Sequence, residues 1–319
     1  MQSKLFLLLF LFVICIQFSS CSKDETITEI DLEQYIDETY NYDPNDFYYT
    51  AQPLDWENYS YAEFGLHLPD SMDRIKGILV LVNGHNGNGM NFKNDPAWRE
   101  FANRNNLAIV GCYIVGNHYD KRYYLAGGGS GYALITAINN FADQTGIDDL
   151  RTLPLALWGY SDGAIFAYTL TCNIPYRVAA FVSDKGGYFP FIADDATTKV
   201  PGFLIYGEND TTRKAESINV FNYYRPQNAL WLLLNHRNNG HELGNELSIA
   251  RSYIEQACAE RIDPVSHELI SLSEGNGFLS SASDREYWAY PDYPHNEDYA
   301  GWLPNESFAV IWKTFVELF

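Results

Sequence analysis

Short apolar runs, separated by segments long enough for helices, are the feature that most restricts how this chain can fold. A strand that is covered on both faces of a parallel sheet is apolar throughout, whereas a strand with one wet face alternates. Six runs have this continuous character: residues 77–82, 107–113, 154–158, 178–182, 202–206 and 229–234. Five segments between or after them repeat apolar residues every three or four positions: 97–105, 131–145, 162–172, 211–224 and 246–260. The pattern predicts an α/β fold with a mostly parallel central sheet and helices on both faces.

The ends of this pattern set the expected domain at residues 61–319. Alternating residues at 61–68, ended by Pro69, predict an edge strand, and residues 305–318 predict a closing helix. Two stretches break the pattern: a loop at 116–130, and an irregular insertion at 262–303 that is rich in Tyr, Trp, Pro and Asp. Irregular insertions of this length in an α/β domain often carry function.

The first residues have the pattern of an export signal. The apolar run 5–16 follows Lys4 and is shorter than the roughly 20 residues that span a bilayer, which indicates a signal peptide. Small residues before Cys21 resemble the lipobox of bacterial lipoprotein precursors, although Phe18 stands where leucine is usual. The residues that follow, Ser22-Lys23-Asp24-Glu25, resemble the acidic export tag of Bacteroidota lipoproteins. We therefore predict a signal peptide at 1–20, lipidation of Cys21 and an outer-membrane or cell-surface location, with a periplasmic or secreted protein as the alternative.

The charge balance argues against a polyanionic partner. The chain has 21 Lys and Arg against 41 Asp and Glu, a net charge of -20, so a nucleic-acid partner is not expected. Residues 22–60 hold eleven of the acids and a single base, Lys23. We interpret residues 21–60 as an acidic tether and N-terminal segment, with membrane contact only through the lipid anchor.

Cysteine, glycine and histidine spacing gives no sign of a metal or a cofactor. Beyond Cys21, the cysteines are far apart and form no Cys-x-x-Cys pair, which excludes a disulfide framework and a zinc ribbon. No His-Glu-x-x-His occurs, and no glycine-rich segment completes a nucleotide-binding motif. Most histidines are interpreted as surface or loop residues: His67, His85, His118, His267 and His295.

The sharpest signal for chemistry is a Gly-x-Ser-x-Gly pattern centred on Ser161. It directly follows the predicted strand 154–158 and opens the predicted helix 162–172. A sharp strand-to-helix turn of this kind presents the serine hydroxyl outward, and small residues on either side let the turn pack closely. Ser161 is therefore a candidate nucleophile.

Candidates for the base and the acid follow in the order that this architecture requires. Asp210 lies just beyond the strand 202–206, and His241 lies in a Gly-flanked loop beyond the last strand. A serine needs a base to take its proton and an acid to orient that base. Glu208 is the rival for the acid, and His236 is the rival for the base.

A glycine-rich loop at 83–89, at the end of the first apolar run, is placed to stabilise an oxyanion. The backbone N–H of Asp162 is one expected donor, because it opens the helix after the serine. We choose the backbone N–H of His85 as the second donor, with Asn86 as the next candidate.

Together these residues resemble the α/β-hydrolase superfamily, over about residues 61–260 and the closing helix. The branch that the chain resembles most is that of secreted polyhydroxybutyrate depolymerases and feruloyl or acetyl-xylan esterases, whose serine motif often contains Ser-Asp. Two departures are visible. Asn83-Gly84 stands where the family usually has His-Gly, and the Asp162 carboxylate must point away from the oxyanion. The resemblance implies a catalytic serine, acid and base and two backbone oxyanion donors at these positions: Ser161, Asp210, His241, His85 and Asp162.

The resemblance implies hydrolysis of a carboxylic ester through an acyl-enzyme, and we expect acylated glycans or related small esters as substrates. A catalytically inactive glycan-binding lipoprotein on a hydrolase scaffold is one alternative. A serine peptidase is the other, although such enzymes usually add a large selecting domain. The oligomeric state is left open.

Overall fold

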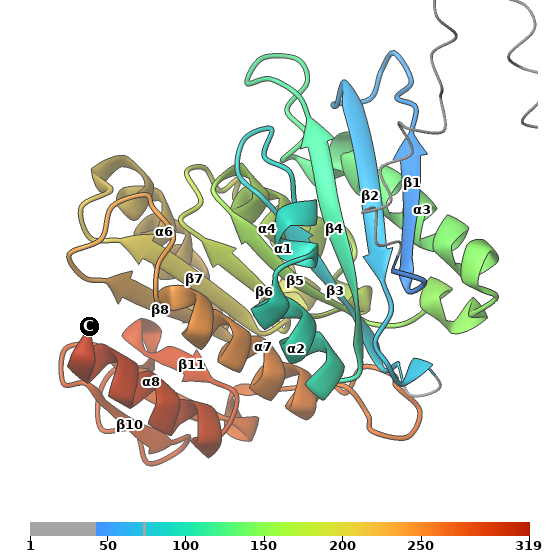
Figure 1. Ribbon diagram of the computed structural model, residues 1–319. Coiled ribbons are helices and arrows are strands. Elements are labelled where there is room, and N and C mark those ends of the chain that lie inside the picture. Colours follow the sequence, from blue (N-terminus) through green and yellow to red (C-terminus); the bar gives the residue numbers. More distant parts are fainter. Residues whose placement is uncertain (1–42, 73–74) are drawn as a thin grey trace, which may run out of the picture. The chain divides into compact units, whose positions relative to one another are not determined.

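An eight-stranded sheet forms the centre of the computed structural model, which describes residues 43–72 and 75–319. The strand order is β1-β2-β4-β3-β5-β6-β7-β8, and the pairs from β4 to β8 are parallel (Figure 1). The predicted signal peptide, Cys21 and the tether up to residue 42 lie outside the described residues.

The six predicted apolar runs are the six parallel strands, which confirms the expected fold class. They are β3 (Gly77–Val82), β4 (Leu107–Val115), β5 (Leu155–Tyr160), β6 (Val178–Asp184), β7 (Gly202–Gly207) and β8 (Trp231–His236). Every residue of β3, β6 and β7 is buried. Continuous apolarity therefore marked strands that have helices on both sides.

The sheet begins earlier than the sequence indicated. Strand β1 (Asp46–Ala51) lies inside the segment 21–60 that we interpreted as an acidic tether and N-terminal segment, and it pairs antiparallel with β2 (Tyr61–His67). Consequently β2 is not the edge strand that we expected, because it lies between β1 and β4. Acidic residues hid β1 in the sequence. Asp46 is buried, where it accepts hydrogen bonds from Lys93 and Arg99.

Helices cover both faces of the sheet (Figure 1). On one face lie α2 (Pro96–Arg104), α7 (Glu246–Arg261) and α8 (Glu306–Leu318). On the other face lie α3 (Ser130–Thr145), α4 (Asp162–Asn173) and α6 (Thr211–Tyr224). Two four-residue helices, α1 (Met90–Lys93) and α5 (Asp195–Thr198), lie in connections. Each face has its own apolar core, as a two-sided sheet requires.

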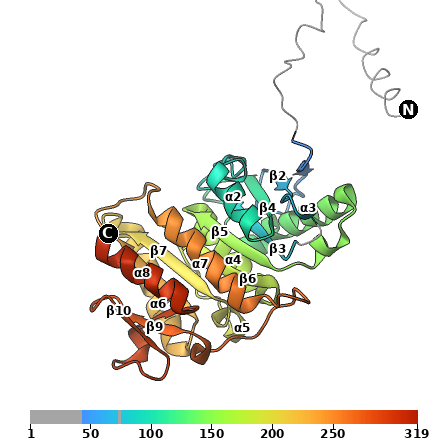
Figure 2. The ribbon, with the colours of Figure 1, turned by 60° about the horizontal axis from the view of Figure 1, so that its bottom comes forward.

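The predicted irregular insertion at 262–303 contains a second, small sheet. Its strands β9 (Phe278–Ser281), β10 (Glu286–Ala289) and β11 (Gly301–Leu303) pair antiparallel in the order β10-β9-β11 and lie beside α8 (Figure 2). Trp302 is fully buried there with Leu230 and Leu279. Strands this short have too few residues for a recognisable alternation, so the sequence showed only turns and aromatics.

The predicted catalytic and oxyanion residues all lie at or just beyond the carboxyl ends of the parallel strands, where ligands bind in open α/β sheets.

Among residues 43–72 and 75–319, no helix has both the length and the apolar content that crossing a bilayer would take.

Candidate functional site

Ser161 occupies a strained turn between β5 and α4. Its backbone has φ 57° and ψ −117°, in the positive-φ range that non-glycine residues rarely adopt. The glycines on both sides make the turn possible: a Cβ on Gly159 would lie 1.9 Å from the carbonyl oxygen of Gly163. A Cβ on Gly163 would lie 2.2 Å from the carbonyl oxygen of Val82. The motif therefore forms the tight strand-to-helix turn that its spacing predicted.

Ser161, His241 and Asp210 come together although they are far apart in the sequence. The Ser161 hydroxyl lies 2.9 Å from His241 Nε2, and His241 Nδ1 lies 2.8 Å from Asp210 Oδ2. The Asp210 side chain is 8% exposed and that of His241 is 31% exposed. In this arrangement the hydroxyl can donate to Nε2 while Nδ1–H donates to the carboxylate, which fixes the tautomer of the ring.

The loop that carries His241 is held by contacts on two sides. The Tyr160 hydroxyl donates to the His241 carbonyl oxygen, and the two rings stack with centroids 5.1 Å apart. The backbone N–H of Asn209 donates to the Asn239 carbonyl oxygen at 2.9 Å. These contacts join the loop after β7, which carries Asp210, to the loop after β8, which carries His241.

The two rival residues have other partners. The Glu208 carboxylate accepts the backbone N–H of Asn238 at 2.9 Å, on the surface, and makes no contact with His241. His236 is buried, and its Nδ1 lies 3.2 Å from the Glu246 carboxylate. Neither rival is in contact with Ser161.

The glycine-rich loop after β3 lies directly against the serine. A Cβ on Gly84 would lie 3.2 Å from Ser161 Cβ. Within the described part of the chain, the backbone N–H groups of His85 and Asp162 have no hydrogen-bond acceptor. The Asn86 side chain is bonded to the backbone of Gly116: its amide oxygen accepts from the Gly116 N–H, and its amide nitrogen donates to the Gly116 carbonyl oxygen. His85 and Asp162 thus present free N–H groups near Ser161.

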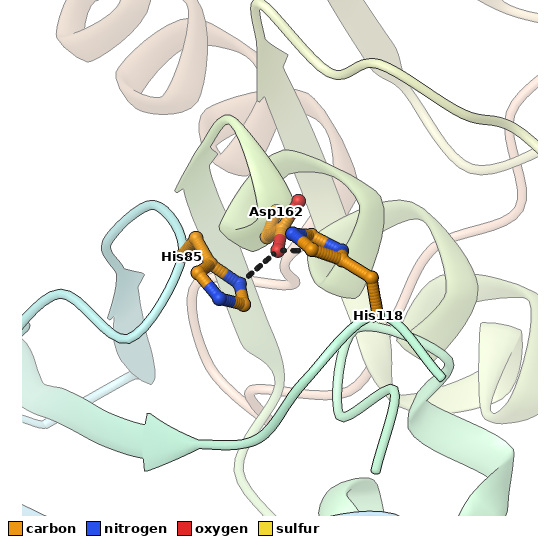
Figure 3. Close-up of side chains that lie close together, drawn as sticks. All are labelled: His85, His118 and Asp162. Atoms are coloured by element: carbon orange, nitrogen blue, oxygen red, sulfur yellow. Dashed lines mark hydrogen bonds and ion pairs between the residues drawn. The ribbon is translucent and has the colours of Figure 1, made fainter. Parts of the chain in front are cut away.

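The Asp162 carboxylate is engaged by imidazoles. His85 Nδ1 lies 2.8 Å from Asp162 Oδ2, and His118 Nδ1 lies 3.9 Å from the same oxygen (Figure 3). The two rings stack with centroids 4.2 Å apart. We interpreted both histidines as surface or loop residues, and nothing in the spacing of 85, 118 and 162 could reveal that they meet.

Comparison with known proteins gives structural matches only. No protein-family model matches the chain, and no curated protein sequence matches it. The poly(aspartic acid) hydrolase-1 of Sphingomonas sp. KT-1 superposes with a TM-score of 0.51 at 16% identity, over 66% of this chain and 98% of that one. The chain has the α/β-hydrolase fold.

Other solved structures of this fold superpose less closely. An acetyl xylan esterase from Aspergillus awamori gives a TM-score of 0.45 at 11% identity, over 65% of this chain and 98% of that one. A poly(3-hydroxybutyrate) depolymerase from Bordetella parapertussis gives 0.48 at 16% identity, over 66% and 87%. At these identities the likeness concerns the fold alone.

A cavity of about 360 Å³ opens beside the serine turn of the hydrolase fold. Asp162 and His118 line it together with Arg213 from α6. Arg213 was missed in the sequence, although it follows Asp210 at helical spacing. Its Nη1 lies 3.4 Å from Asp210 Oδ1, so it contributes positive charge close to the acid and the base.

Burial and Arg213 both lower the pKa of His241. Removal from water disfavours the imidazolium most, the guanidinium adds repulsion, and the Asp210 carboxylate opposes both effects. A histidine acts as a base only when it is neutral. The lowered pKa therefore keeps His241 competent at a pH below the usual range for histidine.

This balance predicts a pH effect of Arg213→Ala. Without the guanidinium the pKa of His241 rises, so the acid limb of kcat/KM against pH moves to higher pH. Lys214→Ala is the matched control, because Lys214 lies over the Tyr206 ring and has no part in the shift of His241. An acid limb that stays in place, or moves to lower pH, would contradict the assignment.

A buried ionic network holds the segment that follows His241. Lys185, directly after β6, is fully buried and donates to the Glu242 carbonyl oxygen at 2.5 Å and to the Glu246 carboxylate at 2.6 Å. Glu246 is also fully buried. Burial, reinforced by the charge of Glu246, raises the pKa of neighbouring Asp184. The network fastens the segment after His241 to the end of β6.

Proposed function

We propose that this protein is a serine hydrolase that cleaves a carboxylic ester through an acyl-enzyme. The observation that carries the proposal is the hydrogen-bonded series from Ser161 Oγ through His241 to Asp210, with links of 2.9 and 2.8 Å. Such a series can activate a hydroxyl that is otherwise a poor nucleophile.

Each residue has a defined task in the proposed reaction. His241 Nε2 takes the proton of Ser161 as its oxygen attacks the ester carbonyl, and Asp210 stabilises the resulting imidazolium. The backbone N–H groups of His85 and Asp162 donate hydrogen bonds to the carbonyl oxygen and stabilise the negative charge that develops on it. His241 then protonates the leaving alcohol. Water, activated by the same imidazole, releases the acid and restores the serine.

Asp210→Asn tests the assignment of the acid. The amide cannot stabilise the imidazolium and favours the wrong tautomer of His241, so kcat for an aryl ester is expected to fall by about 10⁴-fold. Glu208→Gln is the matched control, since the Glu208 carboxylate bonds to Asn238 and Asn235 and not to His241. This variant is expected to stay within about threefold of the unmodified protein. Equal losses in both variants would contradict the proposed roles.

For the substrate we propose an acylated glycan. Three exposed aromatic side chains, Trp56, Tyr132 and Tyr176, line a cavity of about 730 Å³ between the start of α3 and the end of α4, at the opposite end of α4 from Ser161. Aromatic faces of this kind suit stacking against sugar rings. Turnover of acetylated or feruloylated glycans above that of simple aryl esters would support this substrate class, and no preference would contradict it. The lipid anchor at Cys21 lies outside the described residues and stays a prediction.

The same cavity favours the second candidate, an inactive glycan-binding protein on a hydrolase scaffold. Affinity for a glycan together with no turnover of any aryl ester would favour that role. A peptidase is distinguished by turnover of peptide amide substrates, which the proposed esterase is not expected to cleave.

A further inference from the structure

We propose that His85, His118 and Asp162 form a binding site for a divalent transition-metal cation such as Zn²⁺. One ligand atom from each residue lies within 4.8 Å of the other two (Figure 3). Two imidazole nitrogens and a carboxylate oxygen are a donor set that zinc and its neighbours in the first transition row bind. The inference concerns binding and does not depend on the proposed hydrolase activity.

The distances suit a shared ion. Ligand atoms about 2.1 Å from a tetrahedral zinc ion lie about 3.4 Å from one another. The two contacts to Asp162 Oδ2, 2.8 Å from His85 and 3.9 Å from His118, lie on either side of that value. Aiming both nitrogens at one ion requires the stacked rings to turn apart. His118 has room to turn, because its side chain is 57% exposed and no other described residue holds it by a hydrogen bond.

The charge around the cluster leaves a place for a cation. Among the described residues, no lysine or arginine forms an ion pair with Asp162. Arg213 lines the same cavity, but its guanidinium pairs with Asp210. A second cluster shows the contrast. Asp43, Asp46 and His67 also lie within ligand distance of one another, but Lys93 lies 2.7 Å from Asp46 and Arg99 lies 2.8 Å from Asp43. The protein's own cations neutralise that second cluster, so we propose metal binding only at Asp162.

The position of the site would join three separate segments. His85 lies on the loop after β3, His118 on the loop after β4, and Asp162 opens α4 directly after Ser161. Asp162 and His118 also line the 360 Å³ cavity, which gives an ion a route from solvent and room for water in its remaining coordination positions. A bound ion would cross-link these segments and stabilise the folded state by mass action.

Titration calorimetry with ZnCl₂ tests the proposal, using the full chain purified without a polyhistidine tag and treated with chelator. We expect one ion per chain and a rise in Tm on adding zinc. His118→Ala is expected to weaken the affinity by at least about tenfold and to remove the rise in Tm, while the fold without metal stays intact. His295→Ala is the matched control, because His295 is similarly exposed and lies 2.8 Å from Asp284.

Absence of saturable binding would overturn the proposal. Equal affinity in the unmodified protein and in His118→Ala would overturn it as well, as would loss of binding in His295→Ala. Because each measurement is made without substrate, a protein that hydrolyses no ester would still give a decisive result.

Discussion

Ser161→Ala is expected to reduce kcat for an activated ester by about 10⁶-fold, to a residual rate that depends only on binding and the oxyanion donors. The reason is that the variant has no oxygen from which an acyl-enzyme can form, whereas His241 and Asp210 keep their positions. A fluorophosphonate probe reports this directly, because it labels an activated serine. The unmodified protein should be labelled and Ser161→Ala should not.

Ser248→Ala provides the control for Ser161→Ala. Ser248 is near the start of α7, where its hydroxyl donates to the Asn245 carbonyl oxygen, away from the proposed site. Its replacement should leave both labelling and kcat unchanged. Labelling that persists in Ser161→Ala would show that another residue reacts, and the proposed function would be wrong. A melting curve for each variant separates loss of chemistry from loss of fold.

Glu246→Ala is expected to lower the free energy of unfolding by about 3–5 kcal/mol. Glu246 and Lys185 are both fully buried and 2.6 Å apart, so the variant leaves an unpaired ammonium group without water around it. Urea denaturation followed by circular dichroism measures the change. The same variant loosens the segment after His241, since Glu246 also accepts the backbone N–H of Gly244 at 3.0 Å.

Two further variants distinguish the cost of leaving one buried charge unpaired from the contribution of the ion pair to stability. Glu286→Ala removes one partner of an exposed pair, Lys313 and Glu286, which are 2.7 Å apart, and should lower the free energy of unfolding by less than about 1 kcal/mol. The double variant Lys185→Met/Glu246→Met removes both buried charges and should be less destabilised than Glu246→Ala. If Glu246→Ala and Glu286→Ala lower the free energy of unfolding equally, burial of the ion pair makes no measurable difference to stability.

The parallel sheet could be predicted because burial of strands on two faces demands a local pattern. Each of β3 to β8 contains a continuous apolar run, and that run is sufficient to recognise the strand. Strand β1 escaped because the pairing of Asp46 with Lys93 and Arg99 cannot be seen in its own segment. The small sheet escaped because β11 has only three residues and depends on burial of Trp302.

Part of the candidate site could also be predicted from local sequence, and part could not. Ser161 was predictable because the turn requires Gly159 and Gly163 at fixed, short spacing. Asp210 and His241 were predicted from the order of the strand ends. Only the three-dimensional structure shows that Glu208 and His236 bond to other partners. No spacing rule could join His85, His118 and Asp162, because each follows a different strand and the sheet alone brings them together.

The sequence by itself therefore determined the α/β fold and the serine turn, because both depend on contacts between residues close in the chain. The tertiary structure alone decided which acid and which histidine meet Ser161, how Arg213 and Lys185 act on them, and that two imidazoles converge on Asp162. The physical reason is that hydrogen bonds, charge and burial act over a few ångströms in space. Their partners are here separated by tens of residues, and only the packed sheet fixes which ones become neighbours.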